Sequence, residues 1–137
     1  MVGVTEQEAA DIAFLALTLW REARGESEEC LAGIAGCIMN RVSHPAWWGK
    51  DVMSVCFKKW QFSSLTDPND KQLTKWPAID DSSWQRCLKM AKCAIQGIIQ
   101  NPAPGANHYY DISIGPPKWA DQSKFVCQIG RVRFYRL

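Results

Sequence analysis

The sequence predicts a mostly α-helical protein, of the α or α+β class, with a small β element near its C-terminus. Three segments place apolar residues at helical spacing, and polar residues suited to helix capping precede them. Two later segments, 107–112 and 125–135, are expected to be extended, because Val132 and Phe134 alternate with arginines in the second. With 137 residues, the chain is long enough to form one domain, 1–137, with its own core.

The first helix is predicted to begin after Thr5 and to end in a charged motif that closes at Glu26. Thr5 and Glu8 have the spacing of a capping box, in which both side chains bind free backbone N–H groups. Residues 9–20 are almost all apolar, which predicts a helix that is buried on every side. Since the charges begin directly afterwards, this helix is expected to bring Glu22 from the core to the surface.

Two further helices are predicted at about 28–42, capped by Ser27, and at about 83–100. The apolar stripe of the latter consists of Trp84, Leu88, Ala91, Ile95 and Ile98. Between them, 46–79 has no sustained periodicity apart from a short helix at about 51–57. A long loop-rich insertion of this kind is usually a functional surface.

The composition excludes several classes of function. The six cysteines form no C-x-x-C pair and there are only two histidines, so no metal site is predicted, and no cofactor. No Gly-x-Ser-x-Gly nucleophile motif and no glycine-rich phosphate loop is present. The net charge of +2 is too small to indicate nucleic-acid binding, and the apolar run in the first helix is too short for stable membrane insertion. Carboxylate chemistry remains.

Glu22 is the candidate for that chemistry. A carboxyl at the end of a buried helix, next to Trp20, is expected to be partly desolvated. Desolvation disfavours the charged form and raises the pKa, as a general acid near neutral pH requires. The alternative is a solvated glutamate paired with a neighbouring arginine, because structural ion pairs also perturb carboxylates.

The tryptophans indicate the substrate. Five of the seven lie in loop-like stretches: Trp47, Trp48, Trp60, Trp76 and Trp119. Indole rings stack on the C–H faces of sugars, and cleavage of a glycosidic bond needs a carboxylic acid that protonates the leaving oxygen. The alternative is that these side chains only close the edges of the core. Together with Glu22, the tryptophans favour a glycan substrate.

A series of short motifs then runs in order along the chain. They are LWREARGE at 19–26, NRV at 40–42, QFS at 61–63, DPN at 67–69, NP at 101–102, GANHYY at 105–110, PKWA at 117–120, IG at 129–130 and FY at 134–135. In these motifs the chain resembles the cell wall hydrolases related to the spore-cortex-lytic enzyme SleB. One departure stands out, because relatives commonly have a histidine between the last two motifs where this chain has Val132.

The resemblance implies a lysozyme-like, lytic-transglycosylase-like fold and a single catalytic domain. It implies cleavage of the bond from N-acetylmuramic acid to N-acetylglucosamine in peptidoglycan glycan strands. Glu22 matches the glutamate that acts as both acid and base, first protonating the glycosidic oxygen and then deprotonating the muramic 6-hydroxyl to close a 1,6-anhydro ring. Muramidase-type hydrolysis on the same scaffold stays open, as does a non-catalytic wall-binding or virion protein.

The same resemblance suggests substrate-binding residues. These are Gln61, Ser63, His108, Tyr109, Trp119 and Glu26. Two alternatives remain at this stage: one of Tyr109 and Tyr110 is expected to be a core residue of the strand, and Glu26 to bind Arg24 or Arg41 instead of substrate.

The beginning of the chain suggests where the protein acts. Acidic residues stand where a secretory signal peptide would be positive, and no small-residue cleavage site follows. We therefore expect a monomeric phage endolysin, made in the host cytoplasm and reaching the cell wall or periplasm after the membrane is permeabilised.

Overall fold

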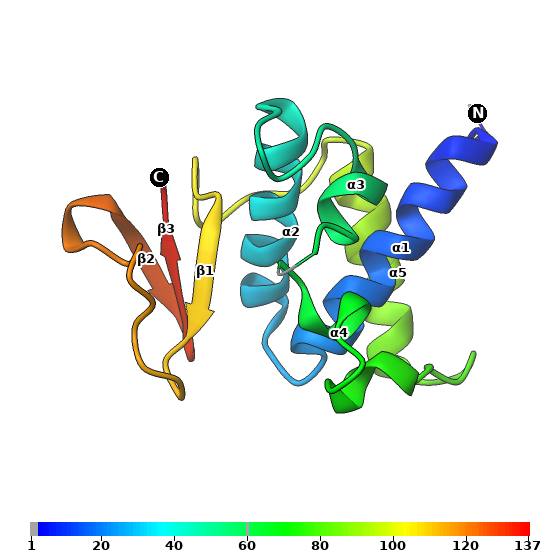
Figure 1. Cartoon of the computed structure of the whole chain (residues 1–137). Coiled ribbons are helices and arrows are strands. Elements are labelled where there is room, and N and C mark those ends of the chain that lie inside the picture. The colour runs from blue at the N-terminus through cyan, green and yellow to red at the C-terminus, as the bar shows by residue number, and fades with distance from the viewer. Residues whose placement is uncertain (1–2, 60) are drawn as a thin grey trace.

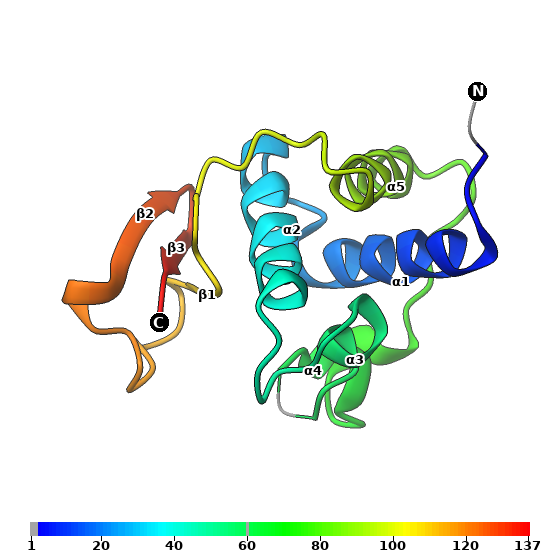
Figure 2. The same cartoon turned by 90° about the horizontal axis from the view of Figure 1, so that it is seen from above.

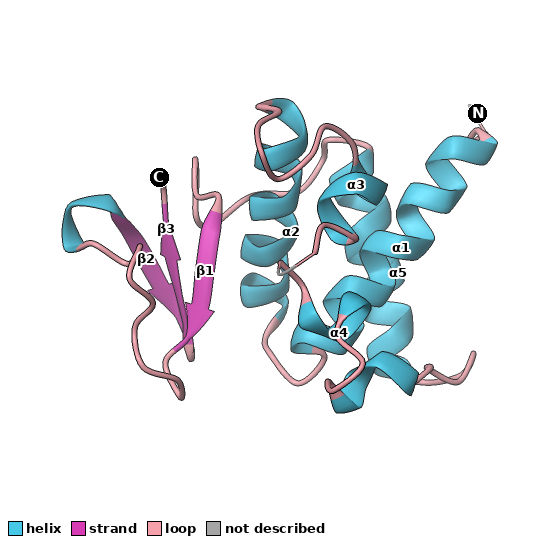
Figure 3. Ribbon diagram, in the orientation of Figure 1, coloured by secondary structure: helices cyan, strands magenta, loops and turns pink. Residues whose placement is uncertain are grey.

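The protein has a three-stranded sheet on one side of helix α2 and the remaining α-helices on the other (Figure 1, and from above in Figure 2). This computed structural model describes residues 3–59 and 61–137. The helices are α1 (Glu6–Ala23), α2 (Glu28–Ser43), α3 (Val52–Cys56), α4 (Ser63–Thr66) and α5 (Ser82–Ile95), with 3-10 turns η1 (Lys71–Thr74) and η2 (Gln122–Lys124). The strands are β1 (His108–Asp111), β2 (Phe125–Ile129) and β3 (Val132–Tyr135). The predicted class, mostly helical with a small C-terminal sheet, is confirmed (Figure 3).

Helix α1 begins as predicted, but only its second half is buried. Thr5 and Glu8 form the capping box. The buried positions are 15–21 and 23, whereas Ala13 is exposed. The N-terminal half extends to the edge of the molecule, away from α2 (Figure 1), so its apolar residues have fewer neighbours to cover them. The expectation of a helix buried on every side is therefore wrong for this half.

Helix α2 forms the centre of the molecule and joins the sheet to the helices. Ser27 caps it as predicted, accepting a hydrogen bond from the backbone N–H of Cys30. At Gly33 a Cβ atom would lie 2.7 Å from Cζ of Phe134, whose side chain is fully buried. Only a residue without a side chain allows this ring of β3 to pack directly on the helix backbone. The sheet is thereby held against α2.

The third predicted helix, α5, is shorter than expected. It ends at Ile95 instead of near residue 100, because Gly97 takes a left-handed conformation with φ of +72°. Ile98 consequently leaves the apolar stripe and is 66% exposed. In the part of the chain that the structure describes, no helix has both the length and the apolar character needed to cross a membrane.

The sheet is antiparallel, with the strand order β1-β3-β2. Tyr109 of β1 pairs with Phe134 of β3, and a short turn at Gly130 joins β2 to β3. Because alternate side chains of a strand point to opposite faces, Tyr109 and Phe134 point towards the helices, whereas His108 points to the other face. This orientation brings Tyr109 to the end of α1.

Candidate active site

A cavity of about 250 Å³ lies where the C-terminal end of α1 meets α2, the segment before α4 and strand β1. Its polar lining consists of Glu22, Glu26, Arg41, Gln61, Tyr109, Tyr110 and Asp111. Apolar side chains, among them Ile34, Phe62 and Val132, line the rest. Three carboxylates and one buried arginine therefore share a partly apolar space, which is the environment in which acid–base groups are tuned.

Glu22 is half-buried in the last turn of α1 and has an altered pKa. Desolvation by burial is the largest effect and raises the pKa of its carboxyl, and the negative charge of Asp70 raises it further. The hydroxyls of Ser64 and Tyr109 act in the opposite direction, because they stabilise the charged form. The raised pKa was predicted, and it keeps a larger share of Glu22 protonated near neutral pH.

The source of that desolvation differs from the prediction. The indole of Trp20 points away from the cavity, where its Nε1 donates to Ser83 Oγ on α5 at 3.0 Å. The guanidinium of Arg24 covers the same ring at 4.2 Å from the ring centre. Glu22 is desolvated by the cavity walls instead, which come from later parts of the chain.

Tyr109 is the direct partner of Glu22. Its hydroxyl donates to Glu22 Oε1 at 3.0 Å, across 87 positions of sequence. Burial, followed by the charge of Glu22, raises the pKa of this phenol well above its usual value, so the hydroxyl keeps its proton and acts as a donor. The bond fixes one carboxyl oxygen and leaves Oε2 of Glu22 free of this contact.

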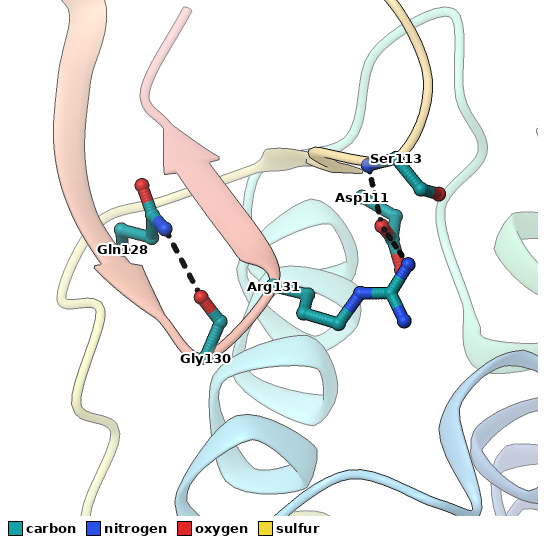
Figure 4. Close-up of polar contacts among 5 residues, drawn as sticks. All are labelled: Asp111, Ser113, Gln128, Gly130 and Arg131. Atoms are coloured by element: carbon teal, nitrogen blue, oxygen red, sulfur yellow. Dashed lines mark hydrogen bonds and ion pairs between the residues drawn. The ribbon is translucent and has the colours of Figure 1, made fainter.

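Asp111 supplies a second carboxylate to the cavity. Its Oδ1 accepts from the backbone N–H of Ser113 at 2.8 Å and lies 3.6 Å from Nη2 of Arg131 (Figure 4). These contacts, the Ser113 backbone bond foremost, lower the pKa of Asp111 and hold it ionised. Asp111 thus forms a turn with Ser113 and lines the cavity as well.

The turn between β2 and β3 positions the arginine that pairs with Asp111. Gln128 Nε2 donates to the carbonyl of Gly130 at 3.0 Å across this turn (Figure 4). Arg131 follows directly, and Val132 is buried in the cavity wall. Within the described residues, no group of three His, Cys, Asp or Glu side chains is arranged to hold a metal ion.

Comparison with known proteins assigns the family. The model of a family described as cell wall hydrolase matches residues 25–135, a span that begins three positions after Glu22. The chain belongs to the cell wall hydrolase family. A search of curated proteins finds no match.

Two solved structures have the fold of this cell wall hydrolase. One is the catalytic domain of the germination-specific lytic transglycosylase SleB from Bacillus anthracis, with 23% identity and a TM-score of 0.74, covering 99% of this chain and 100% of that one. The other is the catalytic domain of the Bacillus cereus SleB protein, with 24% identity and a TM-score of 0.74, covering 99% and 95%. The expected SleB-like fold is confirmed.

Some of the predicted binding residues of this cell wall hydrolase line the cavity. They are Gln61, Tyr109 and Glu26. Among the described residues Glu26 forms no ion pair with Arg24 or Arg41, so the alternative role for Glu26 has no support.

Other predicted binding residues lie outside the cavity. Ser63 is exposed and donates to Asp70 Oδ2 at 2.6 Å, while its neighbour Ser64 is buried beside Glu22. His108 and Trp119 pack against each other on the outer face of β1, with ring centres 4.9 Å apart. Strand alternation turns His108 to the other face of β1, and Ser63 at the start of α4 is exposed, so neither predicted cleft residue lines the cavity. Trp119, predicted to bind substrate, follows β1 in the chain and does not line the cavity. Trp60 lies outside the described residues.

Arg41 is a buried cavity residue that sequence reasoning did not select. Its side chain is buried; Nε donates to the carbonyl of Asn107 at 2.7 Å and Nη1 donates to Gln61 Oε1. Burial lowers the pKa of the guanidinium, which nevertheless keeps its charge because the ordinary value is so high. The available signal was an arginine near the end of a buried helix. Its role became visible only with its partners, which lie 20 and 66 positions away.

Proposed function

We propose that this cell wall hydrolase cleaves the glycosidic bond from N-acetylmuramic acid to N-acetylglucosamine, as a lytic transglycosylase with Glu22 as its single acid/base. The observation that carries the proposal is the Glu22 carboxyl, which lines the cavity with a pKa raised by desolvation and with one oxygen held by Tyr109. Membership of the family and the fold shared with a lytic transglycosylase support it.

The reaction needs two proton transfers at one carboxyl. Protonated Glu22 gives its proton to the glycosidic oxygen, the bond from that oxygen to the muramic C1 breaks, and the N-acetylglucosamine end leaves as an alcohol. Glu22, now a carboxylate, takes the proton of the muramic 6-hydroxyl, whose oxygen bonds to C1 and closes the 1,6-anhydro ring. No water is consumed, and Glu22 returns to its protonated form.

The other carboxylates support a second candidate, muramidase-type hydrolysis. Asp111 is held ionised in the same cavity, and Glu26 lines it as well. A carboxylate on the far side of the sugar can activate a water molecule, as in inverting glycosidases. The products differ, because hydrolysis leaves reducing muramic ends instead of anhydro ends.

Mass spectrometry of the fragments released from purified sacculi tests the proposal. We expect 1,6-anhydro-muramic ends with the wild type and a loss of roughly 10²–10⁴-fold with Glu22→Gln, which keeps the shape and loses the acid. Glu29→Gln, at an exposed position in the first turn of α2, is the matched control. Circular dichroism establishes that both variants fold.

Each other result has a definite meaning. Reducing muramic ends would assign hydrolysis, and Asp111→Asn would then test the water-activating group. Full activity of a folded Glu22→Gln variant would refute the role of Glu22. No release of glycan fragments by the wild type would leave the non-catalytic wall-binding or virion protein.

We also propose that the protein is a phage endolysin, monomeric, that reaches the cell wall from the host cytoplasm after the membrane is opened. Its family and its slight positive charge, which suits an anionic sacculus, support this role. Production in a Gram-negative bacterium tests it: we expect intact cells until the membrane is permeabilised, then rapid lysis that Glu22→Gln does not cause. Lysis without permeabilisation would contradict the proposal.

A further inference from the structure

Trp47 is exposed in a way that packing does not explain. The side chain is 63% exposed, although the rings of Trp48 and His108 lie 5.6 and 6.3 Å from it between centres. Large aromatic side chains are usually buried for most of their area. One part of this indole is therefore supported by neighbouring rings, and most of its surface remains available to a ligand.

The turn that carries Trp47 has a defined shape. Ala46 and Gly49 bond each other through both backbone N–H groups, at 3.4 and 3.1 Å. Gly49 has φ of +121°, and a Cβ there would lie 2.7 Å from Ser54 Oγ, so the turn requires glycine. Within it Trp48 points inward and donates from Nε1 to the Arg41 carbonyl at 3.0 Å, which leaves Trp47 pointing outward.

A continuous set of rings connects Trp47 to the cavity. We define the aromatic row as Tyr110, Trp119, His108 and Trp47. Tyr110 lines the cavity of Glu22, and its ring centre is 6.1 Å from that of Trp119. Trp119 is 4.9 Å from His108, which in turn contacts Trp47. The row thus begins at the cavity edge and ends at the exposed indole.

The row carries no charge near neutral pH. His108 is the only titratable imidazole in it, and burial, followed by the charge of Arg41, lowers its pKa to about 4. Neutral rings do not attract ionic ligands, but the negative faces of aromatic rings attract weakly positive C–H groups, such as those on a sugar face. A groove of about 290 Å³ beside the turn, bordered by Ala46 and Trp48, adds the polar side chains of Asn40, Asn107 and Arg136.

We propose that the aromatic row is a saccharide-binding subsite beyond the cavity, with Trp47 as the platform on which one sugar ring of the glycan strand stacks. This rests on the proposed function, because the strand that is cleaved at Glu22 would be the one that reaches Trp47. In this arrangement Trp48 and His108 support the indole of Trp47 from behind, and Trp119 packs on His108 in turn. The subsite increases affinity for long strands and takes no part in the bond cleavage.

Binding to purified sacculi by cosedimentation tests the proposal, using Glu22→Gln so that the substrate stays intact. In that background we expect Trp47→Ala to raise the half-saturating sacculus concentration roughly tenfold, the loss of one stacking contact. Trp47→Phe should retain most of the binding. Trp76→Ala is the matched control, because Trp76 is 70% exposed but packs over Arg21 outside the cavity; it should bind like its parent.

The outcomes separate this proposal from the proposed function. Unchanged binding of Trp47→Ala, or an equal loss with Trp76→Ala, would overturn the subsite even if the wild type releases anhydro fragments. A selective loss with Trp47→Ala would support the subsite even if the wild type cleaved nothing. Thermal unfolding of each variant shows whether a loss of binding comes from loss of fold.

Discussion

The two walls of the cavity are built in different ways. The helical wall carries Glu22 and Arg41 on α1 and α2, which pack together early in the chain. The sheet wall carries Tyr109 and Asp111 on β1, and its strands span the last part of the chain. Glu22 is thus positioned by a helix whose start and end are set locally, whereas its surroundings come from a distant strand. The position of the Glu22 carboxyl and the groups that shift its pKa therefore come from different parts of the chain and can be altered separately.

Hydrogen bonds and side-chain packing hold the two walls together. Asn40 Nδ2 donates to the carbonyl of Ala106 at 2.8 Å, and Arg41 Nε donates to the carbonyl of Asn107 at 2.7 Å. Phe134 packs on Gly33 below them. Because β1 begins directly after these carbonyls, the two hydrogen bonds and that packing help to set the position of Tyr109, whose hydroxyl bonds Glu22.

Breaking the link at Arg41 is expected to reduce activity more than any other change to the contacts between the walls. Arg41→Lys keeps the charge but cannot reach both Asn107 and Gln61, since lysine lacks the forked donors. We expect the rate of sacculus cleavage to fall roughly tenfold to a hundredfold, because misplacing the groups of an active site lowers the rate on that scale. Thermal unfolding should show that the free energy of unfolding falls by about 1–3 kcal/mol, because buried acceptors are left unpaired.

Arg24→Lys is the matched control for this prediction. Arg24 also donates to a backbone carbonyl, that of Trp20, and to a glutamine side chain, that of Gln72. All of these partners lie on the helical side of the protein. A similar loss of stability without loss of activity would show that the link between the walls matters. Equal losses of activity in both variants would contradict it.

Removing the hydroxyl of Tyr109 changes the pKa of Glu22 but leaves the catalytic carboxyl in place. This hydroxyl stabilises the charged form of Glu22, so Tyr109→Phe should raise the pKa of Glu22 further. A general acid works while protonated, and the alkaline limb of the pH–rate profile should therefore move to higher pH. The maximal rate should fall about tenfold, from loss of a hydrogen bond to a charged group. Tyr135→Phe, a buried tyrosine of β3, should leave the profile in place; a limb that moves to lower pH in Tyr109→Phe would refute this account.

The packing contact is expected to have the smallest effect on activity and a clear effect on stability. In Gly33→Ala the new methyl group would meet the buried ring of Phe134, so we expect about 1–3 kcal/mol of destabilisation from overpacking. Gly115→Ala serves as control, because nothing lies within 4 Å of its Cβ position. Urea unfolding measures both variants, and equal stability of the two would mean that the sheet shifts without cost.

Short-range physics explains which features were predictable from the sequence. The capping box of Thr5 and Glu8, the Ser27 cap and the mostly helical class follow from groups within one or two turns of each other. The same applies to Glu22, because a helix end follows from its neighbours in sequence. Burial does not follow from them, and no residue in the N-terminal half of α1 is fully buried although several are apolar.

Tertiary structure alone determined how the cavity is completed. The family resemblance pointed to Tyr109, but the residue pattern alone did not distinguish it from Tyr110, since the choice depends on the register of β1 against β3 and on the docking of β3 on α2. It pointed to Ser63 where Ser64 lies beside the carboxyl, and it did not select Arg41. A shift of one residue reverses side-chain direction in a strand and rotates it by about 100° in a helix, and only packing between distant segments fixes that shift.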